Sequence, residues 1–420
     1  MKKDKRKLLN RIVSLAAVAA ILVALGTIPA NVSAQEDYLV LEWSADTGSD
    51  VLSIDISNGH VYPSELYVVA GSERKLSLYN GTGTLKWYQN IQIADYWAYG
   101  TSHGVAISGD AQYVVAGDTR GYFRIYNING VLIRTLDLSN GPCYSVDVSN
   151  PLRNENNEAY AVACSGDWFY VYNASSGDLL WSQELIVAGS VINVGISENG
   201  HWIAVSSNNH GTEFHNNTDP SQHHMVWCYN TTDPIVNIAI GRNGTIVVAG
   251  EDDPSNGGTS NVYEFDVGND GVWDVGDGVP RWSRAEPRDI YAVAVSDTEW
   301  CITPIDFSVI SGNTWNDNES EESYYYSSDK IRNWSTGVVW SAAATYDNQS
   351  AYNFRLFGSF DHNVYLVSQA SDDIVDTYTT GGTVNAVGIS FAYHQSCYYY
   401  DYFVAGSADG YVYFFTYDYS

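Results

Sequence analysis

Short segments in which apolar and polar residues alternate recur along the chain at intervals of roughly 40 to 55 residues. Each unit opens with a segment rich in small residues, such as VLSIDIS at Val51, and continues with a phrase such as YVVAGS at Tyr67. Alternation with period two predicts β-strands, and small residues predict strands that crowd a central axis. The second phrase recurs most plainly at 67–72, 113–118, 160–165 and 402–407.

Two further segments complete each unit. The third segment alternates aromatic residues, as in DWFYVYN at Asp167, and the fourth ends on tryptophan in a GxLxW-like setting, as in DLLW at Trp181. Four short antiparallel strands per unit are typical of a propeller blade. Because aromatic side chains bury large areas between sheets, we expect most of the tryptophans and tyrosines to be structural.

The two ends of the chain complement each other. The last unit stops after its third strand at Ser420, whereas an additional tryptophan strand, LVLEW at 39–43, precedes the first complete unit. The N-terminal strand is therefore predicted to complete the last blade, which closes the ring and leaves no wide sheet edge. The predicted fold is an all-β, eight-bladed β-propeller, with seven blades as the alternative if 300–335 is an irregular insertion.

With the GxLxW fourth strands and the AGS-ending second strands, the chain from Asp37 to Ser420 resembles the PQQ-like and WD40-like β-propeller repeat proteins. The resemblance implies a protein that binds more often than it catalyses. In the quinoprotein dehydrogenases of this architecture an adjacent cysteine pair clamps the cofactor, and this chain has no such pair, so no PQQ is expected. The paired GH and WD dipeptides of the WD40 signature are also incomplete.

The first 34 residues have the composition of a targeting segment. A basic start is followed by an apolar run at 12–25 and by small residues before Gln35. This pattern predicts a secretory signal peptide at 1–34, followed by a single propeller domain at 35–420. The alternative is an uncleaved membrane anchor, and no later segment is apolar enough to form a stable membrane span.

Acidic residues strongly outnumber basic ones. Residues 35–420 carry 14 basic and 48 acidic side chains, a net charge of −34. Such a chain repels nucleic acid and anionic lipid, so we expect neither as a partner. The simpler interpretation of this charge is the solubility of a secreted protein. The alternative is a surface that attracts cations.

Cysteine and asparagine patterns add expectations about the secreted environment. The five cysteines are far apart, and only Cys143 and Cys164 are predicted to lie close enough to bridge, with two buried free thiols as the alternative. Asn-X-Ser/Thr motifs predict a glycosylated exterior, although several would arise by chance in this composition. The candidate glycosylation sites are Asn80, Asn173, Asn216, Asn230, Asn243, Asn318, Asn333 and Asn348.

One acidic segment has the spacing of a calcium loop. DVGNDGVWDVGD at 266–277 lies between the third and fourth strands of the fifth unit, with Gly271 at the sharp turn. Calcium needs six to eight oxygen ligands, and a turning loop with alternating acids supplies them. The segment departs from the pattern at two positions, so a weak site or an ion-free hairpin is expected. The predicted ligands are Asp266, Asp270, the Val272 carbonyl, Asp274 and Asp277.

Other polar clusters are weaker indications of a functional site. Four histidines at positions 210, 215, 223 and 224 fall in an expected loop of the fourth unit, without standard metal spacing. The chain contains no GxSxG, HExxH or P-loop motif. Irregular segments, among them 251–253 and 310–322, gather in the fourth to sixth units and predict a contact zone there.

These observations favour a secreted or cell-surface propeller that acts as a non-catalytic scaffold and binds a protein or a glycan through loops. Calcium would stiffen one of its insertions. The alternative is a polysaccharide hydrolase or lyase, in which rim tyrosines stack on sugars and acids transfer protons. Whether the protein is an enzyme stays open from the sequence.

Overall fold

The computed structural model has two compact units, Met1–Asp37 and Tyr38–Ser420, and all residues described below lie in the second. No helix among the described residues is long and apolar enough to cross a membrane. The structure describes residues 39–58, 65–93, 103–186, 189–209, 211–251, 260–266, 274–286, 290–296, 308–313, 321–325, 330–334, 338–344, 354–368, 373–392 and 400–417.

The second unit is an all-β propeller of four-stranded antiparallel blades, as the periodicity predicts, and its strands form eight such sheets. Sheet 1 contains β2 (Val51–Ile56), β3 (Tyr67–Ser72), β4 (Leu76–Asn80) and β5 (Leu85–Gln89). Sheet 2 contains β6 (Val105–Ile107), β7 (Tyr113–Gly117), β8 (Tyr122–Asn127) and β9 (Leu132–Asp137). Sheet 3 contains β10 (Val146–Val148), β11 (Tyr160–Ser165), β12 (Trp168–Asn173) and β13 (Leu179–Glu184). Sheet 4 contains β14 (Val191–Ile196), β15 (Trp202–Ser207), β16 (Gly211–Asn216) and β17 (His224–Asn230).

The remaining sheets follow the same order. Sheet 5 contains β18 (Ile235–Ile240), β19 (Ile246–Glu251), β20 (Ser260–Asp266) and β21 (Trp282–Glu286). Sheet 6 contains β22 (Ile290–Ser296), β23 (Ser308–Asn313), β24 (Glu321–Tyr325) and β25 (Lys330–Trp334). Sheet 7 contains β26 (Val339–Ala344), β27 (Phe354–Ser359), β28 (Asn363–Ser368) and β29 (Asp373–Thr379). Sheet 8 contains β30 (Val384–Ala392), β31 (Tyr400–Ser407), β32 (Tyr411–Tyr417) and β1 (Leu39–Asp46). Short 3-10 helices among the described residues lie in connections, namely η2 (Pro151–Arg153), η3 (Pro220–Gln222) and η4 (Val275–Gly278).

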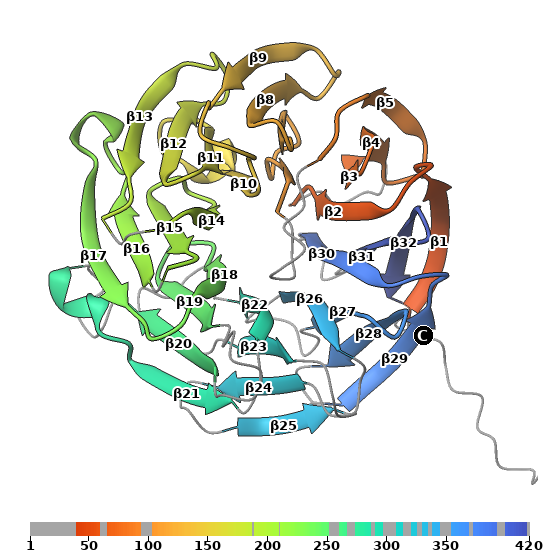
Figure 1. Cartoon of the computed structure of the whole chain (residues 1–420). Coiled ribbons are helices and arrows are strands. Elements are labelled where there is room, and N and C mark those ends of the chain that lie inside the picture. Colours follow the sequence, from red (N-terminus) through yellow and green to blue (C-terminus); the bar gives the residue numbers. More distant parts are fainter. Residues whose placement is uncertain are drawn as a thin grey trace, which may run out of the picture. The chain divides into compact units, whose positions relative to one another are not determined.

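The first strands of successive sheets contact one another around a closed circuit, and β30 returns to contact β2 (Figure 1). The predicted closure is confirmed, because β1 pairs antiparallel with β32 from Leu39–Tyr417 to Asp46–Tyr411. Two side-chain bonds also join the sheets at the closure. The Asn385 amide donates to the Val51 carbonyl at 2.8 Å, and the Ser390 hydroxyl donates to the Ser57 carbonyl at 2.6 Å.

β23, β24 and β25 of sheet 6 lie in the stretch 300–335, which the seven-blade alternative leaves out of the ring. Its β22 side chains are described, whereas β23, β24 and β25 are described by their backbone pairing. The second strand of this sheet is β23, which begins at Ser308.

Fourth strands form the outer edge of the ring and are interrupted by β-bulges. In sheet 1 the register shifts between the pairs Leu78–Trp87 and Tyr79–Leu85, so that Lys86 is the additional residue. The same shift precedes Trp181 in sheet 3 and Trp227 in sheet 4. Bulges twist an edge strand and interrupt its hydrogen-bonding pattern, which protects exposed edges from pairing with other chains.

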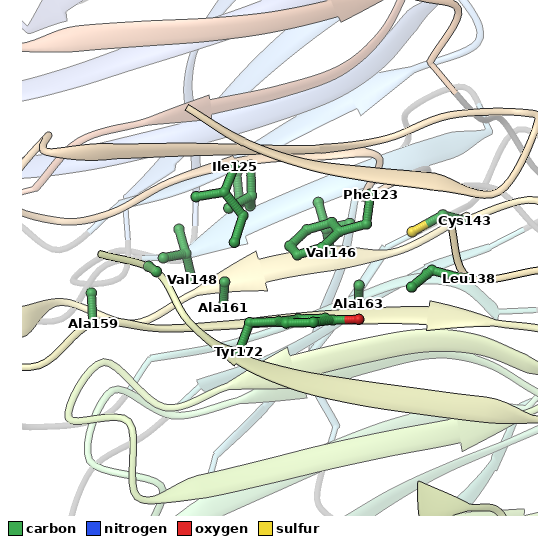
Figure 2. Packing of buried hydrophobic residues seen from close by; sticks show 13 residues of the cluster. Phe123, Ile125, Leu138, Cys143, Val146, Val148, Ala159, Ala161, Ala163 and Tyr172 are labelled. Atoms are coloured by element: carbon green, nitrogen blue, oxygen red, sulfur yellow. The ribbon is translucent and has the colours of Figure 1, made fainter. Parts of the chain in front are cut away.

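The core lies between neighbouring sheets. Between sheets 2 and 3, Phe123 and Ile125 of β8 face small residues of β11 and the ring of Tyr172, as Figure 2 shows. The small side chains Ala161 and Ala163 are fully buried there and leave room for the aromatic rings. Large residues from one sheet thus fill the space that small residues leave on the next, as dense core packing requires.

Fourth-strand tryptophans also connect neighbouring sheets. The Trp43 indole donates to the Gly81 carbonyl at 3.0 Å, and a Cβ on Gly83, where φ is +78°, would lie 2.8 Å from the Trp43 ring. Trp87 donates in the same way to the Ile128 carbonyl of sheet 2 at 2.8 Å. The repeated glycine and tryptophan are therefore two halves of one contact between neighbouring sheets.

Candidate functional site

Two aromatic rings lie together where the first strands of sheets 6 and 7 begin. Tyr291 and Trp340 are the additional residues of β-bulges in β22 and β26, and their ring centroids are 5.0 Å apart. Tyr291 is buried, whereas Trp340 is half-buried and keeps part of its ring open. Bulged first strands of other sheets have Leu52, Val236 and Asn385 at this position.

Phe360 is a third aromatic residue at this place, next to Trp340. It follows β27 in the turn to β28, its side chain is 55% exposed, and its ring lies 6.4 Å from the Trp340 ring. Its backbone amide donates to the Val338 carbonyl at 2.8 Å, which fixes the turn. Equivalent turn positions that the structure describes hold small or polar residues, namely Glu73, Thr119, Gly166, Asn208 and Ala408.

The same turn holds His362 in a left-handed conformation with φ +73°. Sheets 2 and 8 place Gly121 and Gly410 at this position, with φ of +82° and +86°. A left-handed conformation in a residue other than glycine costs about 1 kcal/mol or more, and such positions gather at functional sites. The His362 carbonyl accepts bonds from the Thr380 amide at 2.8 Å and hydroxyl at 2.9 Å, which hold the conformation.

Asp361 lies between the two unusual residues. The Tyr365 hydroxyl donates to Asp361 Oδ2 at 2.5 Å, and the Asn363 amide donates to Oδ1 at 3.0 Å. The Ser359 and Asn363 side chains also donate to this carboxylate, so the turn itself holds it in place. We call Tyr291, Trp340, Phe360, Asp361 and His362 the aromatic corner.

The sequence analysis missed the aromatic corner. It assigned most aromatic residues to structural packing, and it placed the contact zone in the fourth to sixth units. Aligning the units would have revealed Trp340 and Phe360 as aromatic residues at positions where most units have smaller side chains. Their proximity could not be read from that alignment, because 20 residues separate them.

Two aspartates line the first strands nearer the axis. Asp55 Oδ2 accepts a bond from the Ile107 amide of sheet 2 at 2.8 Å, and Asp147 Oδ2 accepts one from the Ile196 amide of sheet 4 at 2.9 Å. Burial raises the pKa of each carboxyl to about 7, and nearby acidic charges add to the rise. Both side chains join neighbouring sheets, so their structural role is evident.

A polar network crosses between sheets beyond the ends of the first strands. Glu198 pairs with Arg242 at 2.9 Å and with Arg153 at 3.7 Å, and it accepts a bond from the Asn58 amide at 3.3 Å. Asn58 follows β2 of sheet 1, whereas Glu198 follows β14 of sheet 4. The network therefore links segments that are far apart along the chain.

The predicted calcium ligands are only partly described. Asp266 ends β20 and pairs with Arg281, while Asp274 caps η4. The Asp274 amide donates to Asp277 Oδ2 at 2.7 Å, which completes a capping box. Asp270 and Val272 lie outside the described residues, so calcium binding stays a prediction. Among the residues that the structure describes, no three His, Cys, Asp or Glu side chains form a group that could hold a metal.

The prediction of one histidine-bearing loop is wrong. His215 lies in β16 and His224 begins β17, so His223 is the one of these three that lies in the connection between the strands. His215 is buried beside Glu213, with Nε2 3.1 Å from Oε2, and burial lowers its pKa. His223 stacks on Trp181 with centroids 4.1 Å apart. His215 and His223 therefore pack as structural residues, His224 is exposed, and His210 lies outside the described residues.

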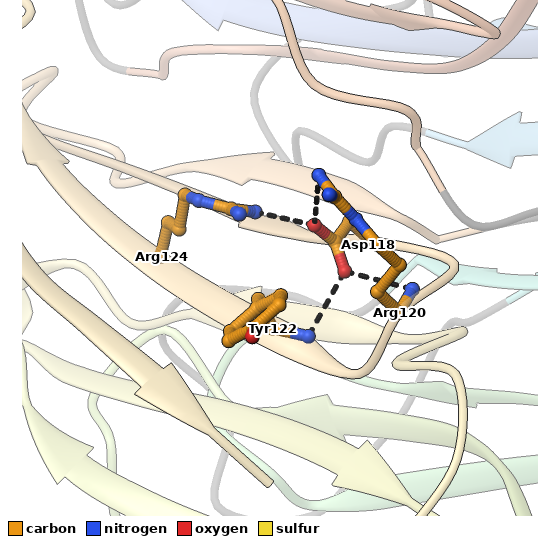
Figure 3. A network of polar contacts seen from close by, with 4 residues as sticks. All are labelled: Asp118, Arg120, Tyr122 and Arg124. Carbon is orange, nitrogen blue, oxygen red and sulfur yellow. Dashed lines mark hydrogen bonds and ion pairs between the residues drawn. The ribbon is translucent and has the colours of Figure 1, made fainter. Parts of the chain in front are cut away.

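Acidic residues at the ends of second strands also have structural roles. The Asp118 carboxylate accepts bonds from the Arg120 and Tyr122 amides and pairs with Arg124 at 2.8 Å (Figure 3). Glu251, which the sequence analysis placed in an irregular run, is the last residue of β19 and accepts the Tyr263 hydroxyl at 2.9 Å. Ser72 accepts a turn amide at the same position in sheet 1.

The segment 310–322 is not the loop that the sequence analysis expected. Ile310 lies in β23, and Glu321 and Glu322 lie in β24, so deleting the segment would remove parts of two strands. The alternation of its residues was obscured by acids, which are uncommon in strands. Most of the proposed contact-zone loops, including 252–259 and 314–320, lie outside the described residues.

Several sequon asparagines form turns between third and fourth strands. Asn80 Oδ1 accepts the Thr84 amide at 2.8 Å, and Asn173 Oδ1 accepts the Ser175 amide at 3.0 Å. Asn127, which is not in a sequon, makes the equivalent bond to Val131 at 3.0 Å. Turn formation therefore explains why asparagine recurs there, and glycosylation stays a prediction. Asn318 and Asn348 lie outside the described residues.

Cys143 and Cys164 are both buried free thiols, so the structure contains no bridge between them. Burial raises the pKa of the Cys164 thiol to about 12, which leaves it protonated and unreactive at neutral pH. Cys143 precedes β10 and lies outside any strand, contrary to the expected pairing of two strand cysteines.

Fold and site together define the class of protein as a β-propeller built from small antiparallel sheets. No protein-family model matches the chain, and no curated protein matches it either. Membership of the PQQ-like or WD40-like families therefore remains a resemblance.

Proposed function

We propose that the protein is a secreted or cell-surface binding scaffold that captures an extracellular partner without transforming it. The proposal treats the eight sheets as the eight blades of one ring. The observation that carries it is the aromatic corner, where Trp340 and Phe360 keep ring surface open to solvent. Aromatic rings held on a fixed framework bind partners well, because little conformational freedom is lost on contact.

The framework around the corner supports this function. Phe360 and His362 are fixed by backbone bonds to Val338 and Thr380, and Tyr365 holds Asp361. The turn therefore has its binding geometry before any partner arrives. In a repeat protein, one turn that departs from its equivalents at two positions is a stronger sign of function than any residue that all units share.

Localisation is part of the proposal and depends on the N-terminal segment. The basic start and apolar run at 1–34 are the features of a secretory signal. A net charge of −34 for residues 35–420 keeps the protein soluble outside the cell and disfavours nucleic acid as a partner.

The test compares capture by the purified protein and by two variants. The wild type and Phe360→Ala are each immobilised and exposed to a cell-surface extract, with Tyr88→Ala as the matched control. Tyr88 is 52% exposed and lies on β5, away from the corner. We expect Phe360→Ala to lose most of the captured material and Tyr88→Ala to retain it.

Equal capture by all three proteins would reject the corner as the contact surface. The enzymatic alternative is examined in the same extract by measuring released reducing ends. Release that depends on the protein and is lost in Asp361→Asn would replace the scaffold with a polysaccharide-cleaving enzyme.

A further inference from the structure

We propose that the aromatic corner binds a pyranose ring of an uncharged or amino-substituted saccharide. This inference rests on the proposed function, because it names the chemical class of the partner that the corner captures.

The two open rings form an angled surface. The Trp340 and Phe360 planes are inclined by 52°, with centroids 6.4 Å apart, so they do not stack on each other. Tyr291 packs behind Trp340 with an interplanar angle of 43° and holds that ring in place. A pyranose presents C–H groups on its faces, and these contact aromatic rings favourably. An angled pair of rings can contact a sugar face and its edge together.

Polar groups flank the rings at the place where sugar hydroxyls would lie. The Asp361 carboxylate accepts bonds from Tyr365, Ser359 and Asn363 within the turn, and the His362 side chain is exposed. A hydroxyl group both donates and accepts, so the exposed imidazole is a suitable partner for it. Aromatic surface with hydrogen-bonding groups at its margin suits a saccharide better than a purely apolar ligand.

The size of the corner favours a sugar unit over a protein surface. A stable protein interface buries about 800 Å² on each partner, whereas one aromatic side chain contributes at most about 250 Å². The corner has one ring that is 55% exposed and one that is half-buried. That area matches one or two pyranose rings and falls short of the core of a protein interface.

Charge narrows the class of saccharide. Residues 35–420 carry a net charge of −34, and the corner itself contains the Asp361 carboxylate. Uronic acids and sulfated sugars would be repelled by this field. A protonated amino sugar would be attracted to Asp361 and to the faces of the rings. We therefore exclude acidic saccharides from the proposed ligands.

The experiment measures binding to three soluble probes by calorimetry or by retardation in affinity gels. The probes are a neutral glucan, a glucosamine oligomer and a polyuronate. Each is tested with the wild type, Trp340→Ala, Phe360→Ala and the control Tyr88→Ala. Thermal melting of each variant establishes that it is folded, and the exposed position of Phe360 keeps that variant informative if Trp340→Ala unfolds.

We expect the wild type and Tyr88→Ala to bind the neutral or the amino probe, and Phe360→Ala to bind at least tenfold more weakly. Binding that is unchanged in Phe360→Ala, or that is tightest for the polyuronate, would overturn the inference. If no probe binds while the corner still captures a partner from the extract, the saccharide inference fails and the scaffold function stands. If the wild type captures no partner from the extract and binds no probe, both the scaffold function and the saccharide inference are rejected.

Discussion

Sheets 7 and 8 share one turn architecture and use it differently. In both, an aspartate in the turn accepts a tyrosine hydroxyl: Asp361 from Tyr365 at 2.5 Å, and Asp409 from Tyr413 at 2.6 Å. Sheet 8 has Ala408 and Gly410 where sheet 7 has Phe360 and His362. The common bond maintains the turn, and the two differing residues expose apolar surface in sheet 7 at a conformational cost.

The sheets also differ at their first strands. Sheet 8 has Asn385 at the bulge position, and this side chain joins β30 to β2 across the closure. Sheet 7 has Trp340 there, which forms the inner wall of the aromatic corner. One sheet of the pair therefore maintains the ring, and its neighbour presents a surface to a partner.

Breaking the closure in sheet 8 should have the largest effect. Trp43 stacks on Phe414 with centroids 5.1 Å apart and donates to Gly81 of sheet 1. We expect Trp43→Ala to lower the free energy of unfolding by about 3 kcal/mol, as for other packed tryptophans. Chemical denaturation measures it, and partner binding below the melting temperature should persist. A loss under 1 kcal/mol would contradict the assigned role of β1.

Giving sheet 7 the turn residues of sheet 8 tests directly whether these residues account for the difference between the two sheets. The double variant Phe360→Ala, His362→Gly gives sheet 7 the residues of sheet 8 and should weaken partner binding at least tenfold. Its free energy of unfolding should rise by about 1 kcal/mol, because glycine adopts φ +73° without strain. Calorimetry and denaturation measure the two effects.

The reverse exchange supplies the control. Ala408→Phe, Gly410→His should destabilise the protein by about 1 kcal/mol without creating a second site, since Asn385 replaces the tryptophan wall. Binding stoichiometry that doubles would show that the turn alone suffices, and that Trp340 is dispensable.

Removing the tyrosine hydroxyl that bonds to the turn aspartate in each sheet distinguishes an effect on stability from an effect on partner binding. Tyr365→Phe and Tyr413→Phe should each lower the free energy of unfolding by about 1 kcal/mol, because each deletes one bond to a carboxylate. Only Tyr365→Phe should also weaken partner binding, since Asp361 lies in the corner. Equal binding losses in both variants would indicate a general effect on the ring.

A pH series distinguishes these turn carboxylates from the carboxyls of the first strands. The pKa values of Asp55 and Asp147 are raised to about 7 from 3.8, so the folded protein holds their protons more tightly than the unfolded chain. Stability should be highest below pH 4 and fall as the pH rises to about 7, by about 1 kcal/mol per group after allowance for solvent screening.

Thermal melting in matched buffers measures this pH dependence. Asp147→Ala should flatten part of the slope, because it removes one of the two carboxyls with a raised pKa. A slope that survives in Asp147→Ala would assign the titration to other groups.

The sequence predicted the backbone architecture well, because that architecture depends on local patterns. Alternation placed the first, second, third and fourth strands of most units, and the surplus strand at 39–43 predicted the pairing of β1 with β32. It failed where local patterns mislead. Acids hid parts of β23 and β24 in a segment that was expected to be irregular.

Side-chain roles were less predictable, since they depend on partners from other units. Glu251 and His215 belonged to polar clusters in the sequence and prove to be held in structural bonds. Whether a polar residue is free to act depends on which donors lie beside it. Those donors come from strands that the sequence does not show to be adjacent.

By itself the sequence determined a closed ring of small sheets, because a period-two pattern repeated along the chain specifies strands, and an incomplete last unit requires the first strand. Only the tertiary structure decided which residues meet across two sheets. Trp340 lies in β26, Phe360 lies in the turn after β27, and Tyr291 comes from another sheet. Their contact exists only because packing around the ring brings these positions together.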